Sequence, residues 1–267
     1  MCDAPPPAGT GAMASCPRCG LLWRRQLITA PPEQAWDDEY WSRDTVRRFY
    51  RARESAFRDI VSLVAARRPP PGKWLDVGCG VGALLGLAAH RGYEVTGIEA
   101  SRIAREAALR HVPGSTIHLG VVPEVLESMG SFDVVTLTDV LRSVEDPART
   151  ISALASHVSE GGLLMVRETD ATKRQEGDFK SSAEVGAYAQ VFAPDTMRWF
   201  CPRVALPEVE ILPSPMFIET GCDERGTASW LPAWTKRSIW PLAMAANRLT
   251  LGRLVLTPNF LALARRR

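Results

Sequence analysis

From residue 73 onward, short apolar runs alternate with segments in which apolar residues recur every three or four positions. The runs predict buried strands, and the periodic segments predict helices. The expected strands are 74–77, 93–98, 116–119, 132–137 and 163–167, and the expected helices are 82–91, 101–111, 122–129 and 146–157. Strands and helices that alternate at this spacing predict a doubly wound α/β sheet, mostly parallel, with helices on both faces.

The pattern is less regular on both sides of this region. We expect a flexible amino terminus over 1–32, because the Pro-, Gly- and Ala-rich start has no periodicity. A helical cap is predicted over 33–70, since apolar residues from Val46 to Val64 have helical spacing and prolines 69–71 cannot continue a helix. The remaining residues, 71–267, form the expected main domain. Its late part predicts a helix over 196–200, strands over 209–212 and 259–264, and an irregular insertion at about 221–253.

The composition is that of an ordinary globular protein, with 46% hydrophobic and 23% charged residues in 267. The 32 basic residues nearly balance the 30 acidic residues, which argues against a nucleic-acid partner. No apolar run reaches the roughly 20 residues of a membrane-spanning helix. The start has no signal-peptide pattern and the six cysteines are too sparse for a disulfide scaffold, so we expect a cytoplasmic protein with reduced thiols.

The strongest motif is the run Leu75-Asp76-Val77-Gly78-Cys79-Gly80-Val81-Gly82, in which a predicted strand turns through three alternating glycines into a helix. Glycine tolerates positive φ and lets a ligand approach the backbone, and the helix start offers free N–H groups. The spacing also fits a dinucleotide fingerprint, because Ala83 completes G-x-G-x-x-A and Glu99 follows Gly78 by 21 residues. Glycine spacing alone therefore leaves the ligand open.

Asp76 shifts the balance between the two ligands. A carboxylate at the end of the first strand would face the pyrophosphate of a dinucleotide, which is unfavourable in a partly buried cleft. A cationic ammonium and sulfonium would be stabilised there, and S-adenosylmethionine (SAM) carries both. An NAD(P)-dependent oxidoreductase stays as the alternative.

With three further segments, the chain resembles the class I SAM-dependent methyltransferases. These segments are Val95–Ser101, Ser131–Leu137 and Gly161–Leu164, and the resemblance covers about residues 70–170. It implies a Rossmann-like sheet of seven strands with an antiparallel last strand near 259–265. It also implies the cofactor-binding residues, which are Asp76, Gly78, Cys79, Gly80 and Gly82 at the methionine half, Glu99, Ala100 and Ser101 at the ribose, Val121 and Val122 at the adenine, and Thr138 at the mouth.

One departure from the family touches the mechanism. Many relatives carry Leu-Glu-His-Val after the fourth strand, whereas this chain has Leu141-Arg142-Ser143-Val144. Neither arginine nor an unassisted serine is a usual general base. The candidate catalytic residues are therefore Asp139, Arg142 and Ser143.

The missing histidine leaves three interpretations open. The base can come from elsewhere, with Asp139, His118 and Tyr188 as candidates. Alternatively the acceptor needs no base, or is a carboxylate or phosphorylated molecule that Arg142 holds. In the third interpretation the protein is a SAM-binding, non-catalytic or regulatory relative.

A second motif, Cys16-Pro17-Arg18-Cys19-Gly20, has the form of a zinc knuckle. It resembles the zinc-ribbon-like start of a subset of these methyltransferases, but a closed site needs four ligands and only Cys2 lies upstream. We expect a degenerate, metal-free turn, with zinc held by Cys16 and Cys19 as the alternative.

The insertion at 221–253 concentrates three tryptophans, Trp230, Trp234 and Trp240, among basic residues and prolines. It predicts a wall of the acceptor pocket, a contact with a membrane surface, or a helix packed on the sheet or in a homodimer. The leading prediction for the whole chain is methyl transfer from SAM to a small-molecule acceptor, by O-, N- or C-methylation.

Overall fold

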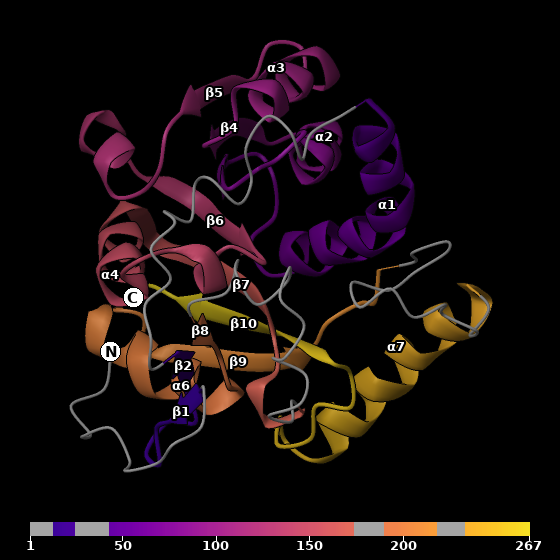
Figure 1. Cartoon of the computed structure of the whole chain (residues 1–267), viewed down its shortest axis with the longest axis vertical. Coiled ribbons are helices and arrows are strands. Elements are labelled where there is room, and N and C mark those ends of the chain that lie inside the picture. Colours follow the sequence, from indigo (N-terminus) through magenta and orange to yellow (C-terminus); the bar gives the residue numbers. More distant parts are fainter. Residues whose placement is uncertain (1–12, 25–42, 174–189, 218–232) are drawn as a thin grey trace.

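The computed structural model describes residues 13–24, 43–173, 190–217 and 233–267 (Figure 1). A seven-stranded sheet in the order β5-β4-β3-β6-β7-β10-β9 forms its centre. Only β10 runs antiparallel to its neighbours β7 and β9, so the predicted fold class is confirmed. The strands are β3 (Lys73–Val77), β4 (Glu94–Glu99), β5 (Thr116–Leu119), β6 (Phe132–Thr138), β7 (Val158–Thr169), β9 (Glu208–Pro213) and β10 (Asn259–Arg265).

Helices cover both faces of this sheet (Figure 1). They are α1 (Arg43–Ala65), α2 (Ala83–His90), α3 (Arg102–His111), α4 (Pro147–His157), α6 (Pro194–Phe200) and α7 (Ala233–Leu249), with 3-10 turns η2 (Glu124–Ser128), η3 (Leu141–Ser143), η4 (Ala171–Lys173) and η6 (Cys201–Val204). The first face, which carries Trp74 and Val95, packs against α1, α2 and α7. The second face, which carries Leu75 and Ile98, packs against α4 and α6.

Alternation along the strands separates the two faces. Strand side chains point to opposite sides in turn, so residues two apart share a face. Leu75 and Val77 lie in the core under α4, whereas Trp74 lies in the core under α1 and α2. Every central strand is buried on both faces, and this explains the continuous apolar runs in the sequence.

Three elements differ from the predicted pattern. Strand β7 begins at Val158, five residues before the predicted start, because its first part continues through Gly161 and Gly162. The predicted helix over 122–129 is the short turn η2. Within the predicted irregular insertion, Ala233–Leu249 form the 17-residue helix α7, which contains Pro241 and packs on β9 through Trp240, as one of the predicted alternatives had it.

A small second sheet was not predicted from the sequence. It joins β1 (Met13–Ser15), β2 (Leu22–Arg24) and β8 (Gln190–Val191) in antiparallel order. These strands have two or three residues each, too few to show an alternating pattern. Residues 13–24 are therefore structured, which differs from the flexible terminus predicted for 1–32. Residues 1–12 and 25–32 of that segment lie outside the described residues.

The predicted zinc knuckle is the turn between β1 and β2. The Gly20 N–H donates to the Cys16 carbonyl (2.9 Å), and the Cys16 N–H donates to the Leu21 carbonyl (2.8 Å). The Thr196 hydroxyl of α6 donates to the Cys19 carbonyl (2.8 Å). Both cysteines are buried in the core beneath α4 and α6, so this turn packs as part of the main body.

Candidate functional site

The glycine loop between β3 and α2 has the conformation that its sequence predicts. Gly78, Gly80 and Gly82 all have positive φ, at 67°, 53° and 81°. The N–H groups of Gly78 and Cys79 both donate to the Ile98 carbonyl, at 2.8 and 3.1 Å, and fasten the loop to the end of β4. A Cβ on Gly78 would lie 2.5 Å from Cγ2 of Val140, so the loop after β6 also requires glycine here.

The two acids predicted to hold the ligand lie at this loop and on one face of the sheet. Asp76 pairs with Gly97 of the neighbouring parallel strand. Gly97 and Glu99 are two residues apart on β4 and therefore share a face, which is the face of Asp76. Both carboxyl groups thus stand at the carboxyl edge of the sheet, under α1 and α2, as the sequence predicted.

Glu99 is bonded directly to the glycine loop. Its Oε2 accepts the Gly80 N–H at 2.7 Å, and its Oε1 accepts the Ser101 N–H at 2.9 Å. Burial raises the pKa of Glu99, and the backbone donors at Ser101, Gly80 and Ala100 oppose this rise. Each carboxylate oxygen can accept a further hydrogen bond, so a hydroxylated ligand has free acceptor positions.

Asp76 is fully enclosed and hydrogen-bonded. Its Oδ1 accepts from the Thr136 hydroxyl (2.6 Å), and the Trp74 indole N–H donates to that hydroxyl oxygen (2.9 Å). Burial raises the pKa of Asp76 to about 7; the Thr136 bond opposes this, and the nearby Glu99 adds to it. Within the described residues no lysine or arginine forms an ion pair with Asp76, so its carboxylate is suited to a cation from a ligand. Thr136 was missed because a threonine in a strand has no distinctive sequence signal.

Beyond Glu99, the loop after β5 presents apolar side chains to the surface. The Gly120 N–H donates to the Glu99 carbonyl (3.0 Å), which places this loop beside the glycine loop. Leu119 and Val121 are 42% and 44% exposed. Val122, in contrast, packs into the core with Leu126. Of the two predicted adenine contacts, Val121 is therefore the exposed one, and Leu119, which was not among the predicted residues, is exposed near it in the chain.

Two of the three predicted catalytic residues, Asp139 and Arg142, lie in a charge cluster after β6. Asp139 has a φ of 61°, a left-handed conformation that is unusual for a non-glycine residue. Its carboxylate forms ion pairs with the guanidinium groups of Arg167 and Arg142, the latter at 3.4 Å. Burial raises the pKa of Asp139, but Arg167, Arg142 and Arg53 outweigh that effect and hold it below its ordinary value.

Two members of this cluster, Arg167 and Glu168, were not predicted. Arg167 donates from Nε to the Ser214 hydroxyl (2.8 Å), and its guanidinium lies 3.9 Å from the centre of the Phe217 ring. Oε1 of Glu168 lies 3.4 Å from the backbone nitrogen of Arg142, within hydrogen-bond reach, and burial raises the pKa of Glu168 to about 7. The signal was the polar run that directly follows the apolar part of β7.

Of the remaining candidates, Thr138 and Ser143 lie at the same edge of the sheet. Thr138 is half-buried on the face of Asp76. Ser143 is half-buried in η3, a turn held by Gln190, whose amide donates to the Val144 carbonyl (2.6 Å). His118 is half-buried on β5, and Tyr188 lies outside the described residues.

Helix α1 covers the loop from the first face. The Tyr50 hydroxyl donates to the Val81 carbonyl, and the Tyr50 ring lies 4.4 Å from that of His111. This contact places the predicted helical cap directly over the glycine loop. Tyr40, the other tyrosine considered for this role, is outside the described part.

Metal ligands are not gathered anywhere in the described ranges. No group of three or more His, Cys, Asp or Glu side chains there is arranged to hold a metal ion. Cys16 and Cys19 lie in the apolar core, and Cys2 is not among the described residues. Zinc binding by these cysteines stays a prediction.

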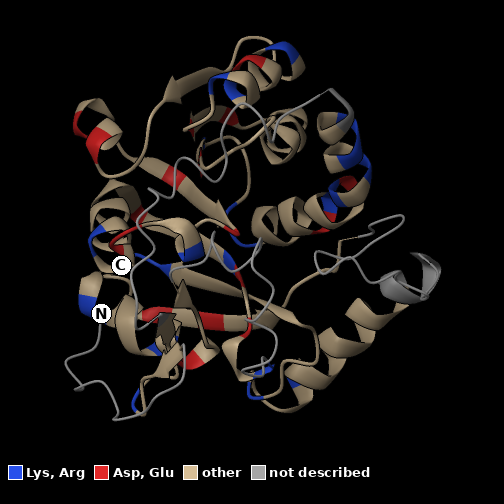
Figure 2. Cartoon of the chain, in the orientation of Figure 1, with Lys and Arg blue, Asp and Glu red and all other residues tan. Residues whose placement is uncertain are grey.

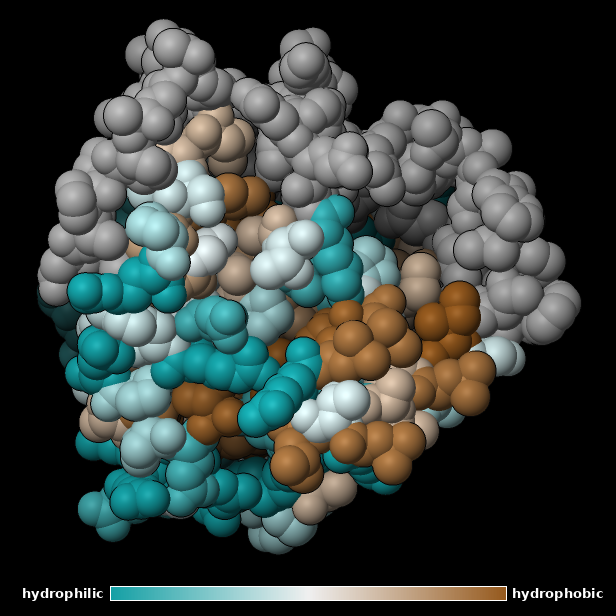
Figure 3. Space-filling model, turned by 90° about the horizontal axis from the view of Figure 1, so that it is seen from below, coloured by the Kyte–Doolittle hydropathy of each residue, from teal (hydrophilic) through white to brown (hydrophobic). Residues whose placement is uncertain are grey.

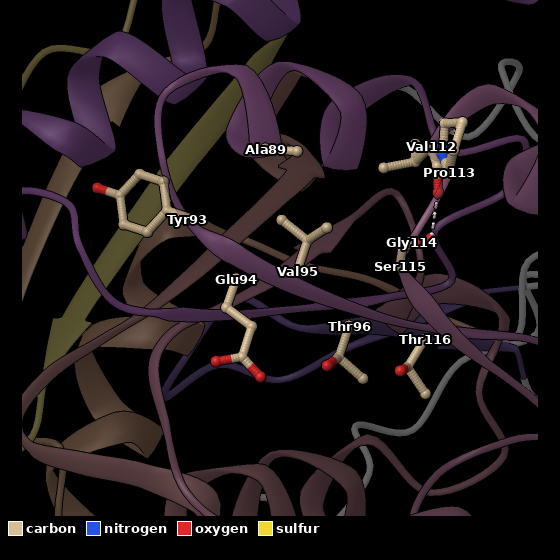
Figure 4. Close-up of a pocket in the computed structure, with 10 residues that line it drawn as sticks. All are labelled: Ala89, Tyr93, Glu94, Val95, Thr96, Val112, Pro113, Gly114, Ser115 and Thr116. Atoms are coloured by element: carbon tan, nitrogen blue, oxygen red, sulfur yellow. Dashed lines mark hydrogen bonds between the residues drawn. The ribbon is translucent and has the colours of Figure 1, made fainter.

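A pocket of about 230 Å³ lies at the other end of β4 and β5 (Figure 4). Glu94, Val95 and Thr116 at the strand starts line it, together with the turn around Gly114. The ligand edge of a parallel sheet is its carboxyl edge. This pocket is therefore separate from the glycine loop.

No helix in the described ranges is long and apolar enough to cross a membrane.

Comparisons with known proteins bear on this site. Residues 48–207 match the sequence model of a methyltransferase domain family. The chain is 34% identical over 113 residues to a dTDP-4-amino-2,3,4,6-tetradeoxy-D-glucose N,N-dimethyltransferase of Saccharopolyspora spinosa, covering 40% of this chain and 45% of that protein. It is 40% identical over 95 residues to a ubiquinone biosynthesis O-methyltransferase of Saccharophagus degradans, covering 34% of this chain and 40% of that protein.

The chain thus spans less than half the length of these two relatives. Among solved structures, a SAM-dependent methyltransferase of Thermotoga maritima matches with a TM-score of 0.61 and 15% identity, over 88% of this chain and 100% of that chain. At this identity the match establishes the shared fold.

Proposed function

Since the chain belongs to the methyltransferase domain family, we propose that it transfers a methyl group from SAM to a small-molecule acceptor. The two similar enzymes reported above are named for N-methylation of an amino sugar and for an O-methylation in ubiquinone biosynthesis. The observation that carries the proposal is the pair Asp76 and Glu99, which converges on one glycine loop at the carboxyl edge of the sheet.

The methionine half of SAM would lie along the glycine loop. Asp76 lacks an ion-pair partner among the described residues, and an ammonium group would stabilise its buried carboxylate. Gly78, Gly80 and Gly82 present backbone without a Cβ at the same place, and the Cys79 side chain between them is buried. These features fit a cation better than a pyrophosphate, and this argues against the NAD(P) alternative.

The nucleoside half would lie over the end of β4. The two oxygens of Glu99 each accept one backbone N–H and have capacity for the ribose hydroxyls. Ala100 is exposed beside them, and Ser101 caps α3 by accepting the Ala104 N–H at 3.2 Å. The adenine would rest on Val121 and Leu119, with Val122 as buried support.

The acceptor would bind at the mouth formed by Thr138, Asp139, Arg142 and Ser143. SAM supplies an activated methyl group on a sulfonium, so much of the catalysis comes from holding the acceptor in line. Asp139 is a weak proton acceptor because its two arginine partners stabilise its ionised form. We therefore assign Asp139 and Arg142 to orientation of the acceptor, with Ser143 as a neutral hydrogen-bonding group.

The proposed function also assigns roles to the helical cap and to the Cys16–Gly20 turn. Residues 43–65 act as the helical cap over SAM, and residues 71–267 form the methyltransferase domain. The Cys16–Gly20 turn is a metal-free remnant of the zinc-ribbon-like start seen in a subset of the family. Its test is metal analysis of the purified protein, in which stoichiometric zinc would contradict this assignment.

Calorimetry with SAM and with NAD tests the main proposal. We expect SAM to bind, and Asp76→Ala or Gly80→Val to weaken SAM binding by at least about tenfold. Arg142→Ala should leave SAM affinity unchanged and raise KM for the acceptor. Binding of NAD in preference to SAM would refute the proposal. SAM binding without methyl transfer to any of a broad acceptor panel would favour the regulatory alternative.

A further inference from the structure

Five leucines on α7 and the segment after it project away from the protein. This leucine face consists of Leu242, Leu249, Leu251, Leu254 and Leu256. The side chains of Leu242, Leu249 and Leu251 are 70%, 86% and 89% exposed. Seen from below, an apolar patch occupies the side of the molecule where Figure 1 places α7 (Figure 3). Apolar clusters of this kind on a protein surface indicate an interaction site.

The leucines are exposed on a well-anchored backbone. On its inner side α7 is fixed by Trp240, whose indole N–H donates to the Pro213 carbonyl (3.0 Å). The following turn is closed by the Asn247 amide, which donates to the Leu254 carbonyl (2.9 Å). Arg198 of α6 donates to the Gly252 carbonyl (2.7 Å). The fold therefore holds these leucines outward instead of leaving them on a loose end.

The charge of this part of the chain is of one sign. Residues 225–267 contain eight lysines and arginines and no aspartate or glutamate. Arg248 and Arg253 are exposed and adjoin Leu249 and Leu254 in the chain, and α7 carries no acidic residue (Figure 2). In an isologous dimer through this face, identical arginines would be brought together, which disfavours a second copy as the partner. The partner should be apolar and anionic.

We propose that the leucine face docks the protein on the surface of an anionic lipid bilayer. Leucines that point outward can enter the boundary between headgroups and acyl chains, while Arg248 and Arg253 pair with lipid phosphates. An amphipathic helix with Lys and Arg beside Trp and Leu has the composition of an interfacial element. The helix lies in the plane of the surface and does not cross the bilayer.

Vesicle co-sedimentation of the full chain tests this proposal without reference to methyl transfer. Vesicles of phosphatidylcholine alone are compared with vesicles that also contain phosphatidylglycerol. We expect binding to the anionic vesicles that weakens with added salt, because the attraction to phosphates is screened. Absence of binding to anionic vesicles at low salt would overturn the proposal.

Two double variants separate the leucines from the arginines. Leu249→Ser with Leu251→Ser, and Arg248→Glu with Arg253→Glu, should each weaken vesicle binding by about tenfold or more. Arg110→Glu on α3 is the matched control, because its side chain is 70% exposed but distant in the sequence from the leucine face, and it should bind as the unmodified chain does. Circular dichroism melting checks that each variant is folded.

Two results would count against the bilayer. Unchanged vesicle binding in both double variants would show that other residues make the contact. A dimer in gel filtration that the leucine variant converts to a monomer, without vesicle binding, would assign the face to a second copy.

Discussion

The affinity for SAM should decrease below pH 7 because Asp76 must lose a proton to bind the ammonium group. Burial raises the pKa of Asp76 to about 7 in the free protein. One unit below that pKa only about one carboxyl in ten is ionised, so the apparent affinity should fall about tenfold for each pH unit, or about 1.4 kcal/mol. Glu99 lies nearby with a raised pKa, and the variant Asp76→Asn separates its contribution.

The same titration affects the stability of the protein without SAM. The folded-state pKa of Asp76 lies above its ordinary value of 3.8, so folding favours the protonated form. Its contribution to the free energy of unfolding is fully present below about pH 4 and is lost as the pH rises through about 7. A rise of about three in pKa corresponds to about 4 kcal/mol over that window. SAM should reverse this loss by stabilising the carboxylate.

Isothermal calorimetry of SAM binding in two buffers with different ionisation heats measures the affinity and the number of protons released. Near pH 6 we expect about 0.9 protons to be released for each SAM bound by the unmodified chain. Asp76→Asn should bind SAM weakly at every pH and release almost no protons. Affinity that is independent of pH between about 5.5 and 7.5, or an Asp76→Asn variant with normal affinity, would refute the assignment of Asp76 to the ammonium.

Three further predictions test the loop, the charge cluster and the cap. Gly78→Ala and Gly114→Ala both place a Cβ at positive φ, but only at Gly78 would it meet another residue. In urea unfolding, Gly114→Ala should lower the free energy of unfolding by about 1 kcal/mol and Gly78→Ala by about 2 to 4 kcal/mol. Only Gly78→Ala should also lose SAM binding. Equal costs would contradict the close approach of Val140 to Gly78. Arg167→Met should lower the free energy of unfolding by about 3 kcal/mol, because it leaves the Asp139 carboxylate without one of its ion-pair partners. Adding Asp139→Asn should recover part of this loss in a double-mutant cycle. Strictly additive effects of the two substitutions would show that Asp139 and Arg167 do not interact. Tyr50→Phe should cost about 1 kcal/mol in thermal melts, and an unchanged melting temperature would show that the bond to the loop is dispensable.

The sequence was sufficient for the central sheet because burial and periodicity agree there. Strand β5 has the predicted bounds, and β3, β4 and β6 begin or end within one residue of prediction. The short strands of the second sheet were not predictable, since their stability comes from pairing with β8 more than 160 residues away. For helix α7, the sequence predicted a helix packed on the sheet only as one of several alternatives, because Pro241 and the exposed leucines weaken its amphipathic pattern.

For the candidate site, sequence reasoning found the groups that belong to one continuous motif. Asp76 and the glycines are adjacent in the chain, and Glu99 follows at a regular interval. Thr136, Arg167 and Glu168 were missed because they come from other strands and become neighbours only through the order of the sheet. Their side chains also lie in the interior, where a sequence pattern predicts apolar residues.

The position of Asp139 at the proposed acceptor mouth depends on the neighbouring strand β7. Its N–H donates to the Arg167 carbonyl (2.9 Å), so the adjacent strand β7 supplies both a backbone acceptor and a guanidinium to the same residue. A non-glycine residue in the left-handed region costs about 1 kcal/mol or more, and these two contacts offset that cost. The Glu and His that many relatives carry after this strand are replaced here by Arg142 and Ser143, and Arg142 forms an ion pair with the opposite carboxylate oxygen of Asp139. The histidine proton acceptor is therefore absent from this position, where Ser143 offers a neutral hydroxyl beside the fixed charge of Arg142, and the chemistry at this mouth should depend on orientation of the acceptor more than on its deprotonation.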